Sequence, residues 1–141
     1  MLRARLLLFA ACCILIAADD SANPALACVK DIALPVYSSA PLAWAARAIG
    51  QYRTVVSLGA DATVASVETE PDQPPVLPRL IESALRSAKF SANCAGRMLT
   101  FTFIYRLDGK PNKYLYEIVK LKAPDTIEIV ANPPLPIPPQ P

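Results

Sequence analysis

The sequence contains no histidine, one tryptophan, four glycines and four cysteines among its 141 residues. Without histidine the chain lacks the usual general base and the commonest protein ligand of metals, and it cannot form a Ser-His or Cys-His pair. The net charge of +2 is too small to indicate nucleic acid as a main partner. Because no carboxylate, lysine or tyrosine pair falls in a recognisable catalytic constellation, we expect no catalytic residue, no metal and no cofactor.

The chain also lacks an apolar run of the ~20 residues that a membrane-spanning helix needs. Its longest run, Leu6–Ala18, follows a short arginine-containing start and ends at two aspartates, as in the central region of an export signal. Small residues favour cleavage after Ala27, so residues 1–27 are predicted to be a signal peptide. Cleavage near Ala18 is one alternative, and an uncleaved signal anchor is another.

Cysteine placement gives a simple expectation once the signal is removed. Cys12 and Cys13 leave with the signal, and the remaining pair, Cys28 and Cys94, is predicted to form a disulfide in an oxidising compartment. A reactive or metal-binding pair is disfavoured, because there is no C-x-x-C spacing and no histidine. In a lipoprotein alternative Cys28 is acylated, and the protein meets a membrane only in that case or with an uncleaved signal.

The hydrophobic pattern predicts a small α+β domain over residues 28–132. The fold class is two helices packed on one face of a small antiparallel sheet, in the order α-β-β-α-β with one or two further strands. The tail over residues 133–141, PPLPIPPQP, is expected to be proline-rich and disordered. The predicted segments are a helix from Pro41 to Ile49, strands Gln51–Leu58 and Thr63–Thr69, a helix from Leu77 to Ala88, and strands Met98–Leu107, Tyr114–Leu121 and Thr126–Val130.

The two predicted helices rest on different signals. The first has serines and Pro41 at its start and Gly50 as its stop, with a stripe of Leu42, Ala45, Ala46 and Ile49 expected to be buried. The second has the clearer apolar stripe, made of Leu77, Leu80, Ile81, Ala84, Leu85 and Ala88.

The order of these elements, together with particular side chains, resembles the C-terminal domain of TonB-type energy transducers. Pro35-x-Tyr37 precedes an alanine-rich helix that leads into Gly50. Thr54-Val55-Val56 through Gly59 resembles the family's first hairpin, and the stretch from Ala84 to Phe90 resembles its helix end. The residues that carry the resemblance are Pro35, Tyr37, Gly50, Gly59, Phe90, Gly96, Phe101 and Phe103.

The resemblance implies an exported, non-catalytic domain in the periplasm or outside the cell of a Gram-negative type of bacterium. In the family this domain adds an extended segment of an outer-membrane receptor to its sheet edge. The expected partner is therefore such a segment, or another envelope protein, bound by strand addition and related to energy transduction for outer-membrane transport.

Two features depart from the family pattern. The chain has neither the long membrane helix nor the N-terminal proline-rich spacer of full transducers. It also continues beyond Leu107, and if Tyr114–Leu121 pairs back on Met98–Leu107, it fills the family's binding edge. The new edge could then serve instead, and the candidate edge residues are Tyr114, Tyr116, Ile118 and Lys120, with Lys120 and Lys122 interpreted first as edge protection.

Two further functional classes stay open. One is a structural envelope protein or lipoprotein on the same fold, with a self-closed sheet edge and no transport role. The other is a small secreted enzyme, which the missing histidine disfavours.

Overall fold

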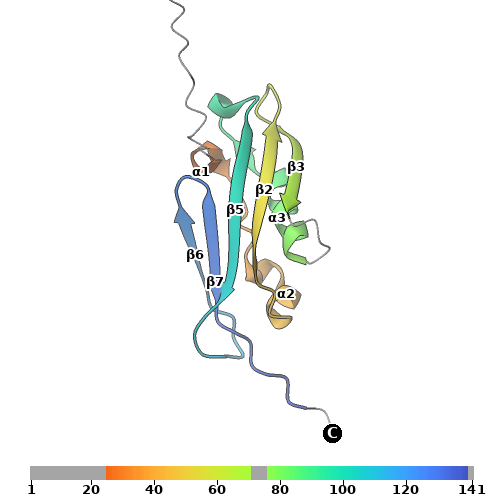
Figure 1. Ribbon diagram of the computed structural model, residues 1–141, viewed down its shortest axis with the longest axis vertical. Coiled ribbons are helices and arrows are strands. Elements are labelled where there is room, and N and C mark those ends of the chain that lie inside the picture. The colour runs from red at the N-terminus through yellow and green to blue at the C-terminus, as the bar shows by residue number, and fades with distance from the viewer. Residues whose placement is uncertain (1–24, 71–75, 140–141) are drawn as a thin grey trace, which may run out of the picture.

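The computed structural model describes residues 25–70 and 76–139. These residues form a five-stranded sheet in the order β3-β2-β5-β7-β6 and a separate two-stranded ribbon of β1 and β4. The predicted α+β fold is confirmed (Figure 1). The elements are α1 (Ala25–Cys28), β1 (Val29–Asp31), η1 (Tyr37–Ser39), α2 (Pro41–Ala45), β2 (Gly50–Leu58), β3 (Val64–Glu70), α3 (Val76–Ser87), β4 (Lys89–Phe90), η2 (Ala92–Cys94), β5 (Met98–Leu107), β6 (Glu117–Lys122) and β7 (Thr126–Ala131).

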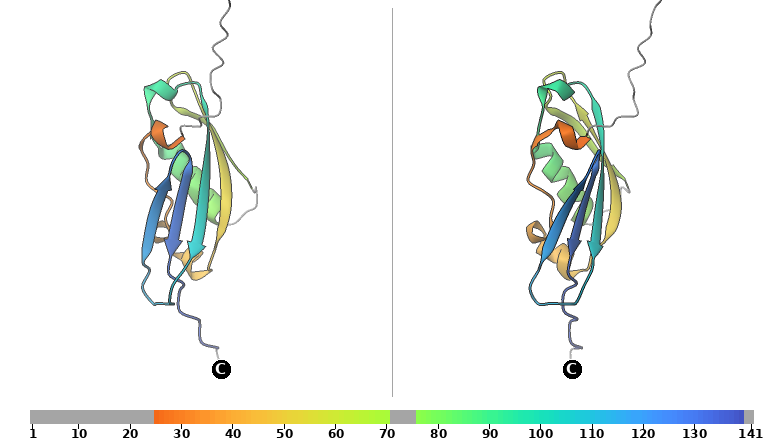
Figure 2. Two further views of the ribbon diagram at one scale, coloured as in Figure 1. Left: turned by 60° about the vertical axis from the view of Figure 1, so that its left-hand side comes forward. Right: turned by 90° about the vertical axis from the view of Figure 1, so that its left-hand side faces the viewer.

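One face of the sheet is covered and the other is open. Helix α3, the short helices and the segment that follows β1 all lie on one side, as Figure 2 shows in two side views. We call the opposite side, on which Arg53, Ile104 and Lys120 lie, the open face. No helix of the described residues covers the open face. Side chains therefore alternate along each strand between the core and this open surface.

The core follows the periodicity of the central strand. On β5, Leu99, Phe101, Phe103 and Tyr105 alternate with open-face residues and are buried toward the helices. Helix α3 covers them with its own buried stripe, Leu77, Ile81 and Leu85, and Pro78 lies in its first turn. This arrangement confirms the second predicted helix and the predicted strand Met98–Leu107, since both have long and unambiguous apolar patterns.

The C-terminal strands differ from the expectation. β6 does not pair with β5; β7 lies between them, parallel to β5 and antiparallel to β6. The sheet is therefore mixed rather than fully antiparallel. The physical reason lies in composition: on β7, Ile127 and Ile129 are buried on the helical side and Glu128 is buried on the open face, which suits an interior strand, whereas exposed Lys120 and Lys122 suit β6 to an edge.

The first predicted helix was wrong in length and in rotation. Helix α2 spans Pro41–Ala45, and its N-cap, Ala40, makes no side-chain capping bond. Leu42 is 80% exposed, whereas Ala43 is buried. Arg47, with φ 55°, ends the segment before Gly50, which instead begins β2. Because alanines occur on several faces of this helix, the faces differ little in hydrophobicity. The packing of neighbouring residues therefore determines which face is buried.

The predicted disulfide between Cys28 and Cys94 is present, with the two Cα atoms 5.9 Å apart. It joins the start of the described chain to η2, next to the β1–β4 ribbon, where the N–H of Ser91 donates to the carbonyl of Cys28. A covalent link of this sequence separation stabilises a fold by about 4 kcal/mol on the chain-entropy model. Because a disulfide persists where thiols are oxidised, it indicates a compartment other than a reducing cytosol.

Most of the predicted signal peptide lies outside the described residues. Of its C-terminal end, Ala25 is completely buried in α1, and the N–H of Leu26 donates to the carbonyl of Pro124 at 3.0 Å. Cleavage after Ala27 would remove these contacts. No helix in the described part of the chain is long and apolar enough to cross a membrane.

Candidate functional site: the free edge of β6

Strand β6 forms one outer edge of the sheet. It pairs with β7 from Glu117 opposite Ala131 to Lys122 opposite Thr126, and no described strand lies on its other side. Such an edge presents backbone N–H and C=O groups that another extended chain can pair with. It is therefore an element on which a strand-binding site can be built, as is β3 at the other edge.

The backbone groups that point away from β7 can be assigned from one hydrogen bond. The N–H of Asn132 donates to the carbonyl of Tyr116 at 3.1 Å, so Tyr116 directs its carbonyl toward β7. Direction alternates along a strand, so Ile118, Lys120 and Lys122 also address β7. Glu117, Val119 and Leu121 consequently direct their N–H and C=O outward. Within the described part of the chain, the outward groups of Val119 and Leu121 have no backbone partner.

Exposed apolar side chains flank this edge. Tyr114, Tyr116, Ile118 and Leu121 are between 59% and 63% exposed. Of the four predicted edge residues, Ile118 and Lys120 lie on β6 itself and point to the open face, whereas Tyr114 and Tyr116 lie in the loop that leads into it. The edge therefore offers apolar contacts beside its free backbone groups.

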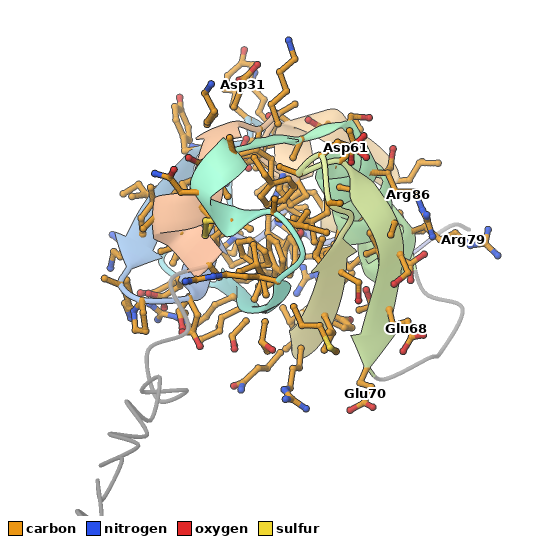
Figure 3. The ribbon with its side chains drawn as sticks, turned by 90° about the horizontal axis from the view of Figure 1, so that it is seen from above. Asp31, Asp61, Glu68, Glu70, Arg79 and Arg86 are labelled. Carbon is orange, nitrogen blue, oxygen red and sulfur yellow. A yellow bond between two sulfur atoms is a disulfide. The ribbon has the colours of Figure 1, made fainter. Side chains whose placement is uncertain are left out.

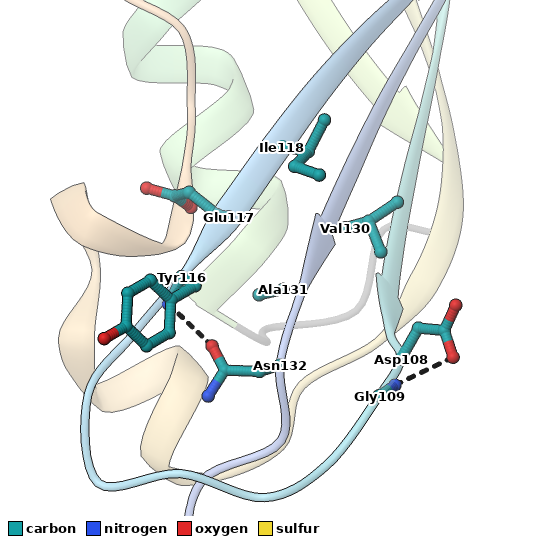
Figure 4. Close-up of a pocket in the computed structure, with 8 residues that line it drawn as sticks. All are labelled: Asp108, Gly109, Tyr116, Glu117, Ile118, Val130, Ala131 and Asn132. Atoms are coloured by element: carbon teal, nitrogen blue, oxygen red, sulfur yellow. Dashed lines mark hydrogen bonds between the residues drawn. The ribbon is translucent and has the colours of Figure 1, made fainter.

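A shallow hollow of about 510 Å³ lies at the beginning of β6. It lies on the open face, where the side chains of Ile118 and Val130 line it (Figure 4). Tyr116 and Asn132 border its lower end, and the side chain of Glu117 points away from it toward η1. Asp108 and Gly109 at the end of β5 also line it. The hollow therefore lies on the β7 side of Ile118, between β6 and the end of β5.

Asn132 holds the loop that leads into β6, and it was not identified from the sequence. Its Oδ1 accepts from the N–H of Tyr116 at 2.6 Å, and its Nδ2 donates to the carbonyl of Tyr114 at 2.9 Å. Its own carbonyl accepts from Nε1 of Trp44 at 2.6 Å. The position of Asn132 directly before two prolines is a turn signal that could have indicated such a role.

The tail begins in contact with the domain. The carbonyl of Pro133 accepts from the N–H of Asn112 at 3.0 Å, and Arg47 Nη2 donates to the carbonyl of Pro134 at 3.1 Å. Pro134 is buried, whereas Leu135 and Ile137 are exposed. The packed region thus extends two residues beyond the predicted domain end at residue 132.

Charges on the open face form a small network around Glu128. Its Oε1 lies 3.1 Å from Nε of Arg106, and its Oε2 lies 2.8 Å from Nζ of Lys122. These cations, Lys122 first, hold the pKa of the buried Glu128 carboxyl below its usual range. Arg106 also reaches Asp108 at 3.6 Å. Lys122 is therefore ion-paired with Glu128, while Lys120 makes no ion pair among the described residues.

The residues that carry the family resemblance lie mostly in the core. The hydroxyl of Tyr105 donates to the carbonyl of Pro35 at 2.6 Å, and the rings of Tyr37 and Tyr105 meet edge to face with centroids 5.5 Å apart. Burial raises the pKa of Tyr37 to about 12 and that of Tyr105 further still, and neighbouring tyrosines and Glu117 add to both shifts.

The remaining motif residues also serve the fold. Phe90 packs near Phe101, the ring centroids being 6.4 Å apart, and Phe103 is buried beside Phe101. The N–H of Gly96, at φ 71°, donates to the carbonyl of Gly59 at 2.9 Å. A Cβ on Gly50 would meet the hydroxyl of Tyr52 at 3.0 Å. These residues serve the fold, and the motif meets β6 at Tyr37, whose N–H donates to the Glu117 carboxylate at 2.9 Å.

No protein-family model matches the chain, and no curated protein or solved structure is significantly similar to it. Among the described residues, no group of three or more histidine, cysteine, aspartate or glutamate side chains is placed to hold a metal ion.

Proposed function

We propose that this chain is an exported, non-enzymatic protein that binds an extended segment of an envelope protein by strand addition to β6. The observation that supports the proposal is the free edge itself, where Val119 and Leu121 direct backbone groups outward beside exposed Ile118 and Tyr116. The sequence resemblance to TonB-type domains points to the same mode of binding and to a partner in the outer membrane. The disulfide fits export to the periplasm or beyond.

The chemistry of the edge describes the segment that would bind. The open-face residues of β6 are Ile118, Lys120 and Lys122, in that order. A strand beside them places every second side chain on the same face. An apolar residue opposite Ile118 packs against the exposed Ile118 side chain, and an acidic residue opposite Lys120 meets a cation that has no other ion pair within the described residues.

The test is a titration of the ¹⁵N-labelled chain with extended peptides that repeat Thr-Val-Thr-Glu, so that valine and glutamate alternate on one face of the added strand. We expect amide shifts concentrated at Glu117–Lys122. A peptide with proline in place of every threonine, which cannot form the ladder, is the control. A flat titration with every extended peptide contradicts the proposal.

A matched pair of variants sharpens this test. Val119→Pro removes an outward N–H without touching the bonds between β6 and β7, and is expected to abolish peptide binding while the fold is kept. Val119→Thr keeps the N–H and the approximate shape of the side chain, so it should bind like the unchanged chain. Equal binding by both variants would show that the backbone edge is not the site.

A structural role in the envelope is the second candidate. It is favoured by β5, which is paired on both sides by β2 and β7, so the edge that corresponds to the family's binding edge is filled. Acylation at Cys28 is disfavoured in this candidate, because its sulfur is already bonded to Cys94. A chain that folds normally and shows no peptide shifts supports this role.

A further inference from the structure

The two outer strands of the sheet run in opposite directions. β3 is antiparallel to β2, β2 is antiparallel to β5, β5 is parallel to β7, and β7 is antiparallel to β6. It follows that β3 and β6 are antiparallel to one another. A second copy placed beside the first by a simple shift across the sheet therefore brings its β3 next to the first copy's β6 as an antiparallel neighbour.

The backbone groups of the two edges are complementary. The N–H of Leu58 donates to the carbonyl of Arg97, on the β5 side, so Val55 and the other odd-numbered residues of β2 address β3. Glu68 lies opposite Val55 and therefore addresses β2, which leaves Val67 and Thr69 directed outward. On both edges the outward groups thus belong to residues whose side chains point to the helical side.

The charges on the two edges have opposite sign and lie on the same face. Glu68 and Glu70 are exposed on the open face of β3 and project from its edge in Figure 3. From the covered side, Glu82 of α3 lines a hollow of about 400 Å³ at that edge together with Glu68 and Glu70. None of these three carboxylates makes an ion pair within the described residues, although Arg53 lies opposite Glu70. The β6 edge carries Lys120 and Lys122.

We propose that copies of this chain associate through these edges, with β3 of one copy against β6 of the next. We choose the register in which the outward-directed residues of both edges lie opposite one another. In it, Val67 is opposite Leu121 and Thr69 is opposite Val119, and these are the hydrogen-bonded pairs. Glu68 then lies opposite Lys120 at a position without backbone hydrogen bonds, where side chains approach most closely. The interface is heterologous, so each added copy leaves a free β3 and a free β6, and the assembly can continue.

The test is sedimentation velocity of the full exported chain at low ionic strength over a series of concentrations. We expect concentration-dependent association that weakens as salt is added. Glu68→Lys and Lys120→Glu should each weaken association about tenfold or more, because each places like charges in contact. A one-to-one mixture of these two variants should restore association, since each supplies the charge that the other now needs. Lys30→Glu, on the β1–β4 ribbon, changes the net charge as Lys120→Glu does and should associate like the unchanged chain.

Three results would overturn the inference: a monomer at every concentration, association that neither charge reversal changes, or two weakened variants whose mixture does not recover. Circular dichroism confirms that each variant is folded. Glu68→Lys leaves β6 intact, so its peptide titration reports on the proposed function alone. If peptides shift the amide signals but the chain does not self-associate, this inference is contradicted and the proposed function stands. If the chain self-associates but no peptide shifts the signals, the proposed function is contradicted and this inference stands.

Discussion

The carboxylate of Glu117, on the edge strand β6, accepts hydrogen bonds from the backbone N–H groups of Tyr37 at 2.9 Å and Ser38 at 3.2 Å. Glu117 thereby supplies acceptors at the start of η1, where the chain offers no side-chain cap of its own. The contact links an edge strand to a segment that lies far from it in sequence.

Replacing Glu117 should reveal how much this link stabilises the fold. Glu117→Ala leaves two amide groups without acceptors and is expected to lower the free energy of unfolding by about 1 to 3 kcal/mol. Urea unfolding measures this change. Glu117→Gln keeps one oxygen acceptor and should lose less; an equal loss for both variants would show that the negative charge, rather than the hydrogen bonds, carries the effect.

Hydrogen exchange should alternate along β6. The amides of Ile118, Lys120 and Lys122 address β7 and should exchange slowly, whereas those of Val119 and Leu121 face outward and should exchange fast in dilute solution. Amide exchange followed by NMR resolves these positions individually. Uniform protection along the strand would contradict the assigned direction of the edge, and the paired strand β5 gives the internal reference for slow exchange.

Alkaline pH should unfold the protein through its buried tyrosines. A tyrosine whose pKa is raised by folding stabilises the fold fully below its unfolded pKa, about 10, and loses that contribution as pH rises through its folded pKa. For Tyr37 that interval is from about 10 to about 12. We therefore expect the urea midpoint to fall across this range, and to fall less steeply in Tyr37→Phe. A midpoint independent of pH above 10 would contradict the burial of these hydroxyls.

Reduction of the disulfide should cost stability without changing the fold's core. Dithiothreitol, or the double change Cys28→Ser and Cys94→Ser, is expected to lower the free energy of unfolding by about 4 kcal/mol. Urea unfolding with and without reductant measures the loss. The double variant should not respond to reductant, and an unchanged wild-type stability after reduction would show that the link constrains little.

Asn132 should control the loop that leads into β6. Asn132→Ala removes an acceptor from Tyr116 and a donor from Tyr114, and each lost hydrogen bond is expected to cost about 1 kcal/mol. Asn132→Asp keeps the acceptor and loses the donor, so it should affect Tyr114 more than Tyr116. Amide exchange at the two tyrosines, together with urea unfolding, separates these outcomes; no change at either would exclude Asn132 as the anchor.

The elements with long patterns were predictable from the sequence, and those decided by packing were not. β5 and α3 carry apolar stripes of one clear period, so their buried faces could be assigned directly. In α2 alanines occur on several faces, so the sequence does not determine which face is buried; the packing of Ala43 and Trp44 determines it. Of the candidate edge residues, Ile118 and Lys120 lie on the outer strand β6, but the strand that pairs with β6 could not be predicted, because the pattern of a short strand does not specify its neighbour. Glu117 acts through backbone groups that are distant in sequence, which no local pattern encodes, whereas for Asn132 the two prolines that follow it were the available turn signal.

The position of β7 has a consequence for the order in which the fold is completed. β2, β3 and α3 come earlier in the chain than β5, but the far side of β5 gains its neighbour only when the last described strand is in place. A chain ending before residue 126 would leave Phe103 and Tyr105 beside an unpaired central edge, which is the arrangement most open to pairing with other chains. β7 thus covers the edge of the central strand β5, and its loss would expose backbone groups there that can pair with other chains.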